Sequence, residues 1–338
     1  MHCVIIGFGL REPERCTLFD YSDDIKGDGQ RIDARRINPY LVDAPDVLIE
    51  RRSAPLLPVP EMSFGNQPID GGYLSLTNEE RQDALEREPQ IAMYIRRYVG
   101  AEEFINGMER YCLWLKDAPP NALRASSFIV KRLEAVRQFR LASRRLATQE
   151  LAARPSLFAF ISHVEKPYLL IPSVSSERRE FVPIGFMPPD VIASNLVLTI
   201  PNATLYHFAT LNSTMHNAWL RAVGGRLKSD YRYSASIVYN NFPWPEPTEA
   251  QRAAIEAAGQ AILDARALYP DATLADLYDP LTMPPELRRA HQANDRAVDA
   301  AYGYKGDRAD APRVAYLFTL YQKLTSLLPA AGGKKRKG

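Results

Sequence analysis

The amino-acid sequence predicts an α+β protein in which a mixed, strand-rich body precedes a small helical domain. Between residues 160 and 242, short apolar runs are bounded by Pro, Gly and Ser, which is typical of strands. After Pro247 the composition changes to Ala-rich segments with apolar residues at helical spacing. The chain has 338 residues, of which 46% are hydrophobic, and this is enough for buried cores in about two domains.

The N-terminal part combines one predicted strand with irregular segments. Residues 3–9, CVIIGFG, form a short apolar run with β-branched side chains, which predicts a buried strand. Residues 20–40 are polar and contain Gly, so we expect a loop or a hairpin there. Residues 41–56 lie between prolines and are expected to form a short strand or helix.

A helix, a strand and a second helix are predicted next. Thr77 or Asn78 is expected to cap a helix, because two glutamates follow in its first turn. Residues 109–116 alternate as a strand does until a pair of prolines stops the pattern. Residues 121–154 have apolar side chains at helical spacing and predict a helix.

The rest of the body is expected to be rich in strands. Short apolar runs predict strands at residues 159–164, 167–174, 180–186, 196–201 and 236–242. Residues 212–225 predict a helix that Asn212 or Ser213 caps and two glycines end. Amphipathic segments predict three C-terminal helices, at residues 248–270, 284–304 and 311–328. Thr248 is the expected cap of the first of these helices.

Composition and charge exclude several classes of protein. The net charge is only +2, so a surface for anions requires an uneven distribution of cations. No apolar run approaches the roughly 20 residues that span a bilayer, and the start of the chain has no small-residue cleavage site. Cys3, Cys16 and Cys112 are too few and too scattered for a disulfide framework. We therefore expect a cytoplasmic protein without a membrane partner.

No catalytic residue and no metal site is predicted. The histidines are dispersed without metal-ligand spacing, and the sequence has neither a P-loop nor a GxSxG motif. Gly-Phe-Gly at residues 7–9 lacks the third glycine and the acidic ribose partner of a dinucleotide site. Asn-Pro-Tyr at residues 38–40 lacks one proline of the Asn-Pro-Pro-Tyr motif that holds a flipped adenine. Both short motifs predict turns.

Basic side chains gather in two segments that suit phosphate groups. Residues 121–155 contain eight basic and two acidic residues, and their spacing predicts one helix face that carries Arg137, Arg140 and Arg144. Residues 174–180 bring hydroxyls and guanidinium groups together at a strand boundary, which are common phosphate contacts. The side chains concerned are Ser175, Ser176, Arg178 and Arg179.

A third segment, residues 224–245, alternates cations with tyrosines and asparagines before a Pro-Trp-Pro junction. Arg and Lys can read guanine, Asn can read adenine, and Asp can accept a hydrogen bond from cytosine. The side chains concerned are Arg226, Lys228, Asp230, Tyr231, Arg232, Tyr233, Asn240 and Asn241. Three dispersed patches of similar chemistry favour a duplex, which presents phosphates on two sides.

Several long stretches of this sequence together carry a family resemblance. They are INPYLVDAPDVLIERRSAPL, PEMSFGNQPIDGG, IPSVSSERREFVPIGF, STMHNAWLRAVGGRLKSDYRYSASIVYNNFPWP and LADLYDPLTMPPELRRAHQANDRAVDAAYG. The chain resembles the carboxy-terminal half of MmeI-like enzymes, which are single-chain restriction–modification proteins and related bacterial DNA adenine methyltransferases. The likeness runs over almost the whole chain.

The resemblance implies a domain order and a division of labour. Residues 1–39 would be a remnant of the methyltransferase core with its connecting loop, 40–245 a DNA target recognition domain, 246–330 a helical domain and 331–338 a disordered basic tail. The methyl-donor and Asn-Pro-Pro-Tyr motifs are expected upstream, so this chain is not expected to catalyse methylation alone. S-adenosylmethionine would serve the full-length family, with no cofactor in this chain. An upstream methyltransferase or nuclease polypeptide is a possible partner.

The resemblance also implies double-stranded DNA as the partner and suggests the contacts. For base readout the candidates are Arg226, Lys228, Asp230 and Arg232. For the DNA backbone they are Ser175, Ser176, Arg178, Arg179, Arg137, Arg140 and Arg144. Two other functions stay open at this point: an intact S-adenosylmethionine-dependent methyltransferase that uses residues 7–9 and 38–40, and a protein-interaction scaffold that uses the C-terminal helices.

Overall fold

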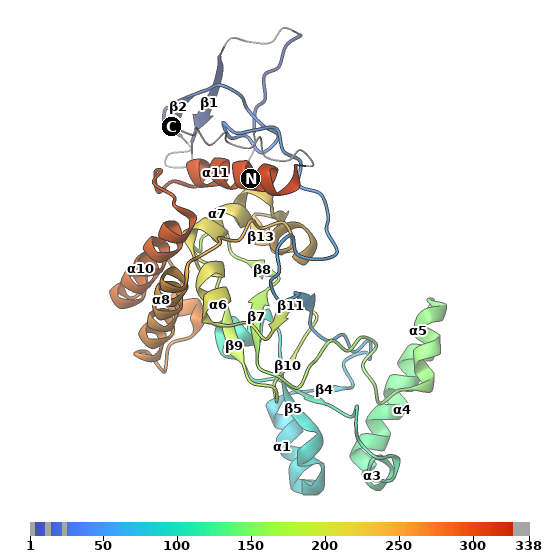
Figure 1. The fold of residues 1–338 in the computed structure, drawn as a ribbon. Helices are drawn as coiled ribbons and strands as arrows, with labels where there is room; N and C mark the ends of the chain where they lie inside the picture. Colours follow the sequence, from blue (N-terminus) through green and yellow to red (C-terminus); the bar gives the residue numbers. More distant parts are fainter. Residues whose placement is uncertain (1–3, 11–14, 22–25, 327–338) are drawn as a thin grey trace, which may run out of the picture.

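The computed structural model describes residues 4–10, 15–21 and 26–326. Small sheets and short helices form a body, helices cover one side of it, and a separate helical arm protrudes from the other side (Figure 1). The predicted mixed α+β class is confirmed. Within the described ranges, no helix combines the length and the apolar character that crossing a membrane requires.

The N-terminal segment differs from the prediction. Residues 4–10 form no strand, and the Ile5 side chain is 96% exposed. A strand needs a neighbouring backbone for its N–H and C=O groups, and no sheet of the described residues includes this segment. The buried strand expected at residues 3–9 is therefore wrong for residues 4–9. A loop or hairpin was expected at residues 20–40. A hairpin is present, but it begins earlier: β1 (Cys16–Asp20) pairs with β2 (Gln30–Ala34), so only its second strand lies inside the expected range.

Residues 41–56 form neither the strand nor the helix that was expected. They run as an irregular segment along residues 235–241. The Arg52 N–H donates to the Ser236 carbonyl at 2.9 Å, and Asn240 Nδ2 donates to the Arg52 carbonyl at 2.9 Å. The prolines of this segment prevent a regular ladder, so individual side chains satisfy its backbone instead.

The strand expected at residues 236–242 is a single π-helical turn, η3 (Ala235–Tyr239). The amides that follow it are buried: Asn241 Nδ2 donates to the carbonyls of Glu50, Ser236 and Ile237. The side-chain amides of Asn240 and Asn241 thus hydrogen bond to backbone carbonyls within the protein. The expectation that Asn240 and Asn241 read adenine is therefore wrong.

Three sheets form the body, in the strand orders β10-β5-β6-β4, β3-β11-β7-β9 and β12-β13-β8. The strands of the first are β4 (Ser75–Leu76), β5 (Ile95–Val99), β6 (Tyr111–Leu113) and β10 (Ile192–Ala193). Those of the second are β3 (Ser63–Phe64), β7 (Tyr168–Pro172), β9 (Gly185–Met187) and β11 (Val197–Pro201). Those of the third are β8 (Val174–Ser175), β12 (Gly225–Leu227) and β13 (Asp230–Arg232).

Most of the predicted strands are present in whole or in part; the exceptions among the described residues are those expected at 4–9, 159–164 and 236–242. Residues 159–164 contribute only the isolated bridge between Phe160 and Gln67. Strand β5 was not predicted from the sequence.

The helices of the body are α1 (Asn78–Arg87), η1 (Pro89–Tyr94), α2 (Ala101–Asn106), α6 (Leu205–Leu211) and α7 (Thr214–Val223). Two of them, α1 and α7, begin at the expected side-chain caps. Thr77 Oγ1 accepts from the Glu80 N–H, and the Glu80 carboxylate accepts from the Thr77 N–H, which is a capping box. Ser213 Oγ caps α7 by accepting from the His216 N–H at 3.2 Å.

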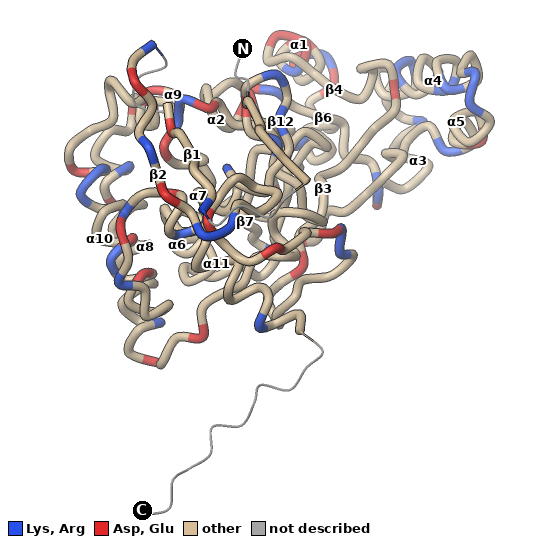
Figure 2. Tube along the Cα trace, turned by 90° about the horizontal axis from the view of Figure 1, so that it is seen from above, with Lys and Arg blue, Asp and Glu red and all other residues tan. Residues whose placement is uncertain are grey.

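The basic segment expected as one helix at residues 121–154 is broken into pieces, which we call the arm. They are α3 (Pro120–Ala125), α4 (Ser127–Leu141), α5 (Leu146–Glu150) and η2 (Leu151–Ala153). The break at Ser126 has a local cause, since its Oγ accepts from the Ile129 N–H at 3.0 Å and starts a new helix. Both views show the arm extending away from the body (Figure 1, Figure 2).

Arg140 fixes the base of the arm from inside the protein. Its side chain is 0% exposed, and its guanidinium group donates to five backbone carbonyls at 2.8–3.0 Å. The carbonyls belong to Pro68, Ile69, Leu151, Arg154 and Leu157. All five N–H donors of the side chain are thus satisfied. The prediction that Arg140 holds a DNA phosphate is therefore wrong.

The C-terminal helices pack onto the body as part of the same hydrophobic core. They are α8 (Glu249–Ala267), α9 (Leu274–Leu277), α10 (Pro285–Tyr302) and α11 (Asp310–Thr325). Gly259 lets α8 approach α6 closely, because a Cβ at this position would lie 2.9 Å from the Ala209 Cβ. The three long helices and the Thr248 cap match the prediction, while the expected basic tail lies outside the described residues.

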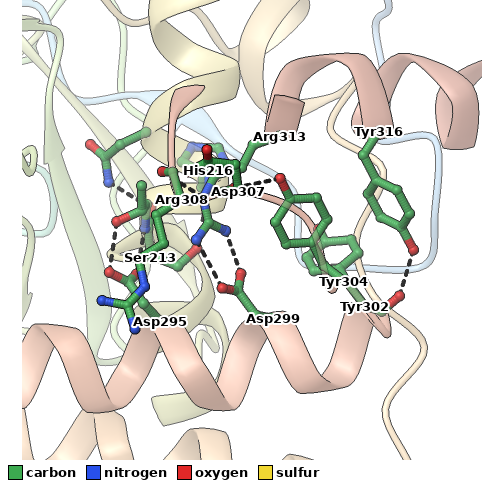
Figure 3. Close-up of polar contacts among 12 residues, drawn as sticks. Ser213, His216, Asp295, Asp299, Tyr302, Tyr304, Asp307, Arg308, Arg313 and Tyr316 are labelled. Atoms are coloured by element: carbon green, nitrogen blue, oxygen red, sulfur yellow. Dashed lines mark hydrogen bonds and ion pairs between the residues drawn. The ribbon is translucent and has the colours of Figure 1, made fainter. Parts of the chain in front are cut away.

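Half-buried acidic side chains of α10 join the C-terminal helices to α7 and to one another (Figure 3). The Asp295 carboxylate accepts from the N–H and the Oγ1 of Thr214 at 2.6 and 2.7 Å. Asp299 pairs with Arg313 through both carboxylate oxygens. Burial raises the pKa of Asp295 to about 6, although the bonds from Thr214 and the charge of Arg313 oppose this shift.

Replacing Arg140 by Lys is expected to lower the free energy of unfolding by about 3 kcal/mol, because an ammonium group cannot reach all five carbonyls. Urea unfolding measures this loss. The matched control is Arg137→Lys, the same change at an exposed position of α4, for which we expect little effect. Equal effects of the two substitutions would contradict the structural role of Arg140.

Asp295 is expected to make stability depend on pH. Because its folded pKa of about 6 lies above the ordinary value of 3.8, its contribution is complete below about pH 4 and is lost as the pH rises through about 6. From pH 5 to pH 7 the Tm should therefore fall more in the wild type than in Asp295→Asn. The exposed Asp271→Asn serves as control. If Asp295→Asn keeps the full pH dependence of the wild type, this explanation fails.

Candidate nucleic-acid interface

The third sheet brings together two of the three segments that the sequence singled out. Strand β13 pairs with β12 on one side and with β8 on the other, with Tyr231 opposite Ser175 and Arg232 opposite Val174. The Glu177 N–H also donates to Asp230 Oδ1 at 3.3 Å. The segments 174–180 and 224–232, far apart in the sequence, are therefore one surface. We call residues 225–232 the reading hairpin.

The strand register distributes the hairpin side chains over two faces. Neighbouring residues of a strand point to opposite faces, so Arg226 shares a face with Tyr231, and Asp230 shares the other face with Arg232. The Arg226 guanidinium carbon lies 3.9 Å from the Tyr231 ring centroid, within cation–π distance. Lys228 occupies the turn with a φ of 57°. The four base-readout candidates thus lie together but do not form a single flat face.

Exposure separates the candidate cations of this surface from its supports. Arg178, Arg226, Lys228 and Arg232 are exposed, whereas Ser176, Arg179 and Asp230 are half-buried. Burial lowers the pKa of Arg179, and the carboxylates of Asp230 and Asp279 oppose the shift. Ser175 is only 3% exposed, so its hydroxyl does not reach the surface as a phosphate contact must. That part of the prediction is wrong.

Helix α7 holds both strands of the reading hairpin. Gly224 alone separates α7 from β12, and a Cβ at Gly224 would lie 2.4 Å from the Leu220 carbonyl oxygen. After β13, the Tyr233 hydroxyl hydrogen bonds to His216 Nε2 of α7 at 2.8 Å. Complete burial lowers the pKa of His216 to about 3, so this imidazole is neutral at pH 7. Tyr233, which the sequence grouped with the DNA-facing side chains, is instead a buried anchor.

The third basic segment stands apart from this surface. The arm extends away from β8 and β13 in Figure 1 and away from β12 in Figure 2. Arg137 and Arg144 are exposed on the arm, and Arg137 lies 3.7 Å from Glu134. The cations that the sequence predicted as one set therefore form two separate groups.

The two short motifs near the N-terminus do not fit a methyl-donor site. Gly7 and Gly9 are exposed, and a Cβ on either would meet nothing within 4 Å. Asn38 is buried, and its Oδ1 accepts from the N–H groups of Tyr40 and Val42. Tyr40 in turn lies 4.9 Å from Phe318, measured between ring centroids. Residues 38–40 are therefore a structural turn, as predicted, and none of the described His, Cys, Asp and Glu side chains cluster as metal ligands.

Sequence reasoning missed the residues that position the hairpin. Arg221 of α7 donates to both oxygens of Asp310 on α11, and its Nη1 donates to the Glu180 carbonyl at 3.0 Å. The partners are far apart in the sequence, so no local pattern indicates the pair. One sequence feature could have indicated that α7 supports the hairpin: the helix with the Ser213 cap ends only one residue before the basic segment begins.

Known proteins resemble this chain along nearly its whole length. The family models for the MmeI target recognition domain and the MmeI C-terminal domain match residues 43–246 and 247–329. DNA methyltransferase A of Bacillus subtilis (strain 168) is 38% identical over 322 residues, which cover 95% of this chain and 36% of that protein. The type IIL restriction-modification enzyme MmeI, solved in complex with DNA, is 48% identical with a TM-score of 0.88.

The match to that structure covers 94% of this chain and 42% of the MmeI chain, so this chain spans less than half the length of either relative. The two family models together match residues 43–329. The chain therefore belongs to the MmeI family, and it corresponds to the target recognition domain and the C-terminal domain of that family.

Proposed function

We propose that this chain binds double-stranded DNA at specific sites, as the target recognition part of a restriction–modification DNA adenine methyltransferase. The observation that carries the proposal is the reading hairpin, a cation-bearing ribbon within a domain that is 48% identical to an enzyme solved in complex with DNA. A two-stranded ribbon fits the major groove, where every base pair presents a distinct pattern of donors and acceptors.

The exposed ends of the hairpin supply the base contacts. Arg226, Lys228 and Arg232 carry donors that suit the O6 and N7 acceptors of guanine. Asp230 holds the Glu177 N–H with one carboxylate oxygen, and we assign its other oxygen to the cytosine amino group. Since the side chains occupy both faces, the hairpin enters the groove with its turn leading and contacts bases on either side of it.

The remaining cations hold the phosphate backbone. Arg178 and Arg179, with the Ser176 hydroxyl, flank the reading hairpin and bind the strand beside it. Arg137 and Arg144 on the arm bind phosphates farther along the duplex, because the arm lies away from the hairpin. Two separate grips fix the orientation of the duplex and leave the choice of bases to the hairpin.

We do not assign the chemistry of methyl transfer to the residues of this chain. S-adenosylmethionine is the methyl donor that the family resemblance implies, and residues 7–9 and 38–40 do not fit it. We therefore place the donor site and the catalytic residues on a methyltransferase or nuclease part that this chain orients on DNA. A DNA partner also supports the bacterial cytoplasm as the compartment.

Removing Arg226 and Arg232 together by substitution with Ala is expected to weaken binding to a duplex selected from a randomised library. Each lost bidentate base contact should reduce discrimination by about 1–3 kcal/mol. Gel shifts with selected and unselected duplexes measure this. The charge-matched control is Arg289→Ala with Arg296→Ala on the exposed face of α10. Unchanged affinity of the hairpin variant would remove both arginines from the interface.

Substituting Arg137 and Arg144 with Ala should weaken binding to all duplexes by the same factor. Because the lost contacts are to phosphates, the slope of log K against log salt should become less steep by about 0.9 per contact, and the ratio of specific to non-specific affinity should stay constant. A salt series of binding isotherms tests this. A changed preference among duplexes, with an unchanged salt slope, would show that the arm does not act as a phosphate clamp.

A further inference from the structure

We infer that the C-terminal domain positions the reading hairpin through α7, with Asp295 and Asp310 as the positioning residues. The inference rests on the proposed function and assigns a role in DNA recognition to a domain that need not touch DNA itself. It follows from a chain of buried and half-buried contacts that runs from α10 and α11 to α7 and from α7 to the hairpin.

The first link is the rigid attachment of the hairpin to α7. At the start of β12, Gly224 packs so closely on the last turn of the helix that no Cβ fits there. At the end of β13, the buried hydroxyl of Tyr233 hydrogen bonds to the buried ring of His216. Because both strands are tied to one helix, a rotation or shift of α7 moves the hairpin with it.

The second link is the attachment of α7 to the C-terminal domain at both of its ends. At the first turn, Thr214 donates its N–H and its hydroxyl to Asp295 of α10. At the last turn, Arg221 forms a bidentate pair with Asp310 of α11. Between them, Trp219 is fully buried, with ring centroids 5.6 Å from Phe318 of α11. Helix α7 is therefore expected to move only together with the C-terminal domain.

The nature of these contacts favours positioning over stability alone. A bidentate pair between a guanidinium group and a carboxylate fixes direction as well as distance. By contrast, the bonds of the pair between Arg313 and Asp299 join α11 to α10 within the C-terminal domain. The two pairs use the same chemistry, one across the junction and one beside it, which gives a matched comparison. Figure 3 shows the second of them, between Arg313 and Asp299.

The experiment compares Asp310→Asn, Asp310→Glu and Asp299→Asn in the full 338-residue chain. Affinity is measured for a duplex selected from a randomised library and for an unselected duplex, well below the Tm of each variant. Hydrogen exchange of the backbone amides of residues 225–232 is measured without DNA. We expect Asp310→Asn to lower the ratio of specific to non-specific affinity by roughly fivefold or more and to speed exchange in the hairpin.

Asp310→Glu should keep most of both properties, because a carboxylate still faces Arg221. Asp299→Asn should lower the Tm without changing the ratio or the hairpin exchange. Two outcomes overturn the inference: Asp310→Asn leaves ratio and exchange unchanged, or Asp299→Asn reproduces both effects. If the wild type selects no duplex, the proposed function fails, while the exchange data still decide whether Asp310 positions the hairpin.

Discussion

The surface that carries the hairpin depends on one constraint: its sheet is too small to be stable by itself. Strand β8 has two residues, and β12 and β13 have three each, whereas an isolated hairpin is only marginally stable in water. The sheet is ordered because α7, which is buried along most of its length, holds the strands at both ends. The positions of the exposed cations on the hairpin therefore depend on how α7 is packed in the core.

Arginine serves two opposite purposes in this protein, and burial separates them. Arg140 and Arg313 are buried and Arg221 is half-buried, and the planar donors of all three match several carbonyl or carboxylate oxygens at fixed angles. Arg178 and Arg232 are outside and free to meet a ligand. The spacing of Arg137, Arg140 and Arg144 predicts one helix face, but the carbonyls that enclose Arg140 come from distant loops. Counting charges in the sequence therefore overestimates the interface.

Local chemistry made much of the fold predictable. The caps at Thr77, Ser213 and Thr248 have their partners within three residues, and each helix begins where the sequence places it. The apolar run at residues 168–172 predicts a strand, and the structure has a fully buried strand there. Prediction failed where partners are remote, as at residues 236–242. The family resemblance located the hairpin, but its two faces follow from the pairing register, which no single segment determines.

The turn of the hairpin has a consequence for how such a protein diversifies. Arg226, Lys228 and Arg232 lie outside the packed interior, and β12 is the terminal strand of its sheet. Exchanging the Arg226 or Arg232 side chain removes no buried hydrogen bond or ion pair among the described residues, and surface changes of this kind usually alter stability by less than about 0.5 kcal/mol. At Lys228 the φ of 57° restricts the exchange to residues that tolerate a left-handed backbone. Substitutions in the hairpin can therefore change which ligand is preferred while the free energy of unfolding stays nearly constant. Specificity can evolve in this way without loss of the fold.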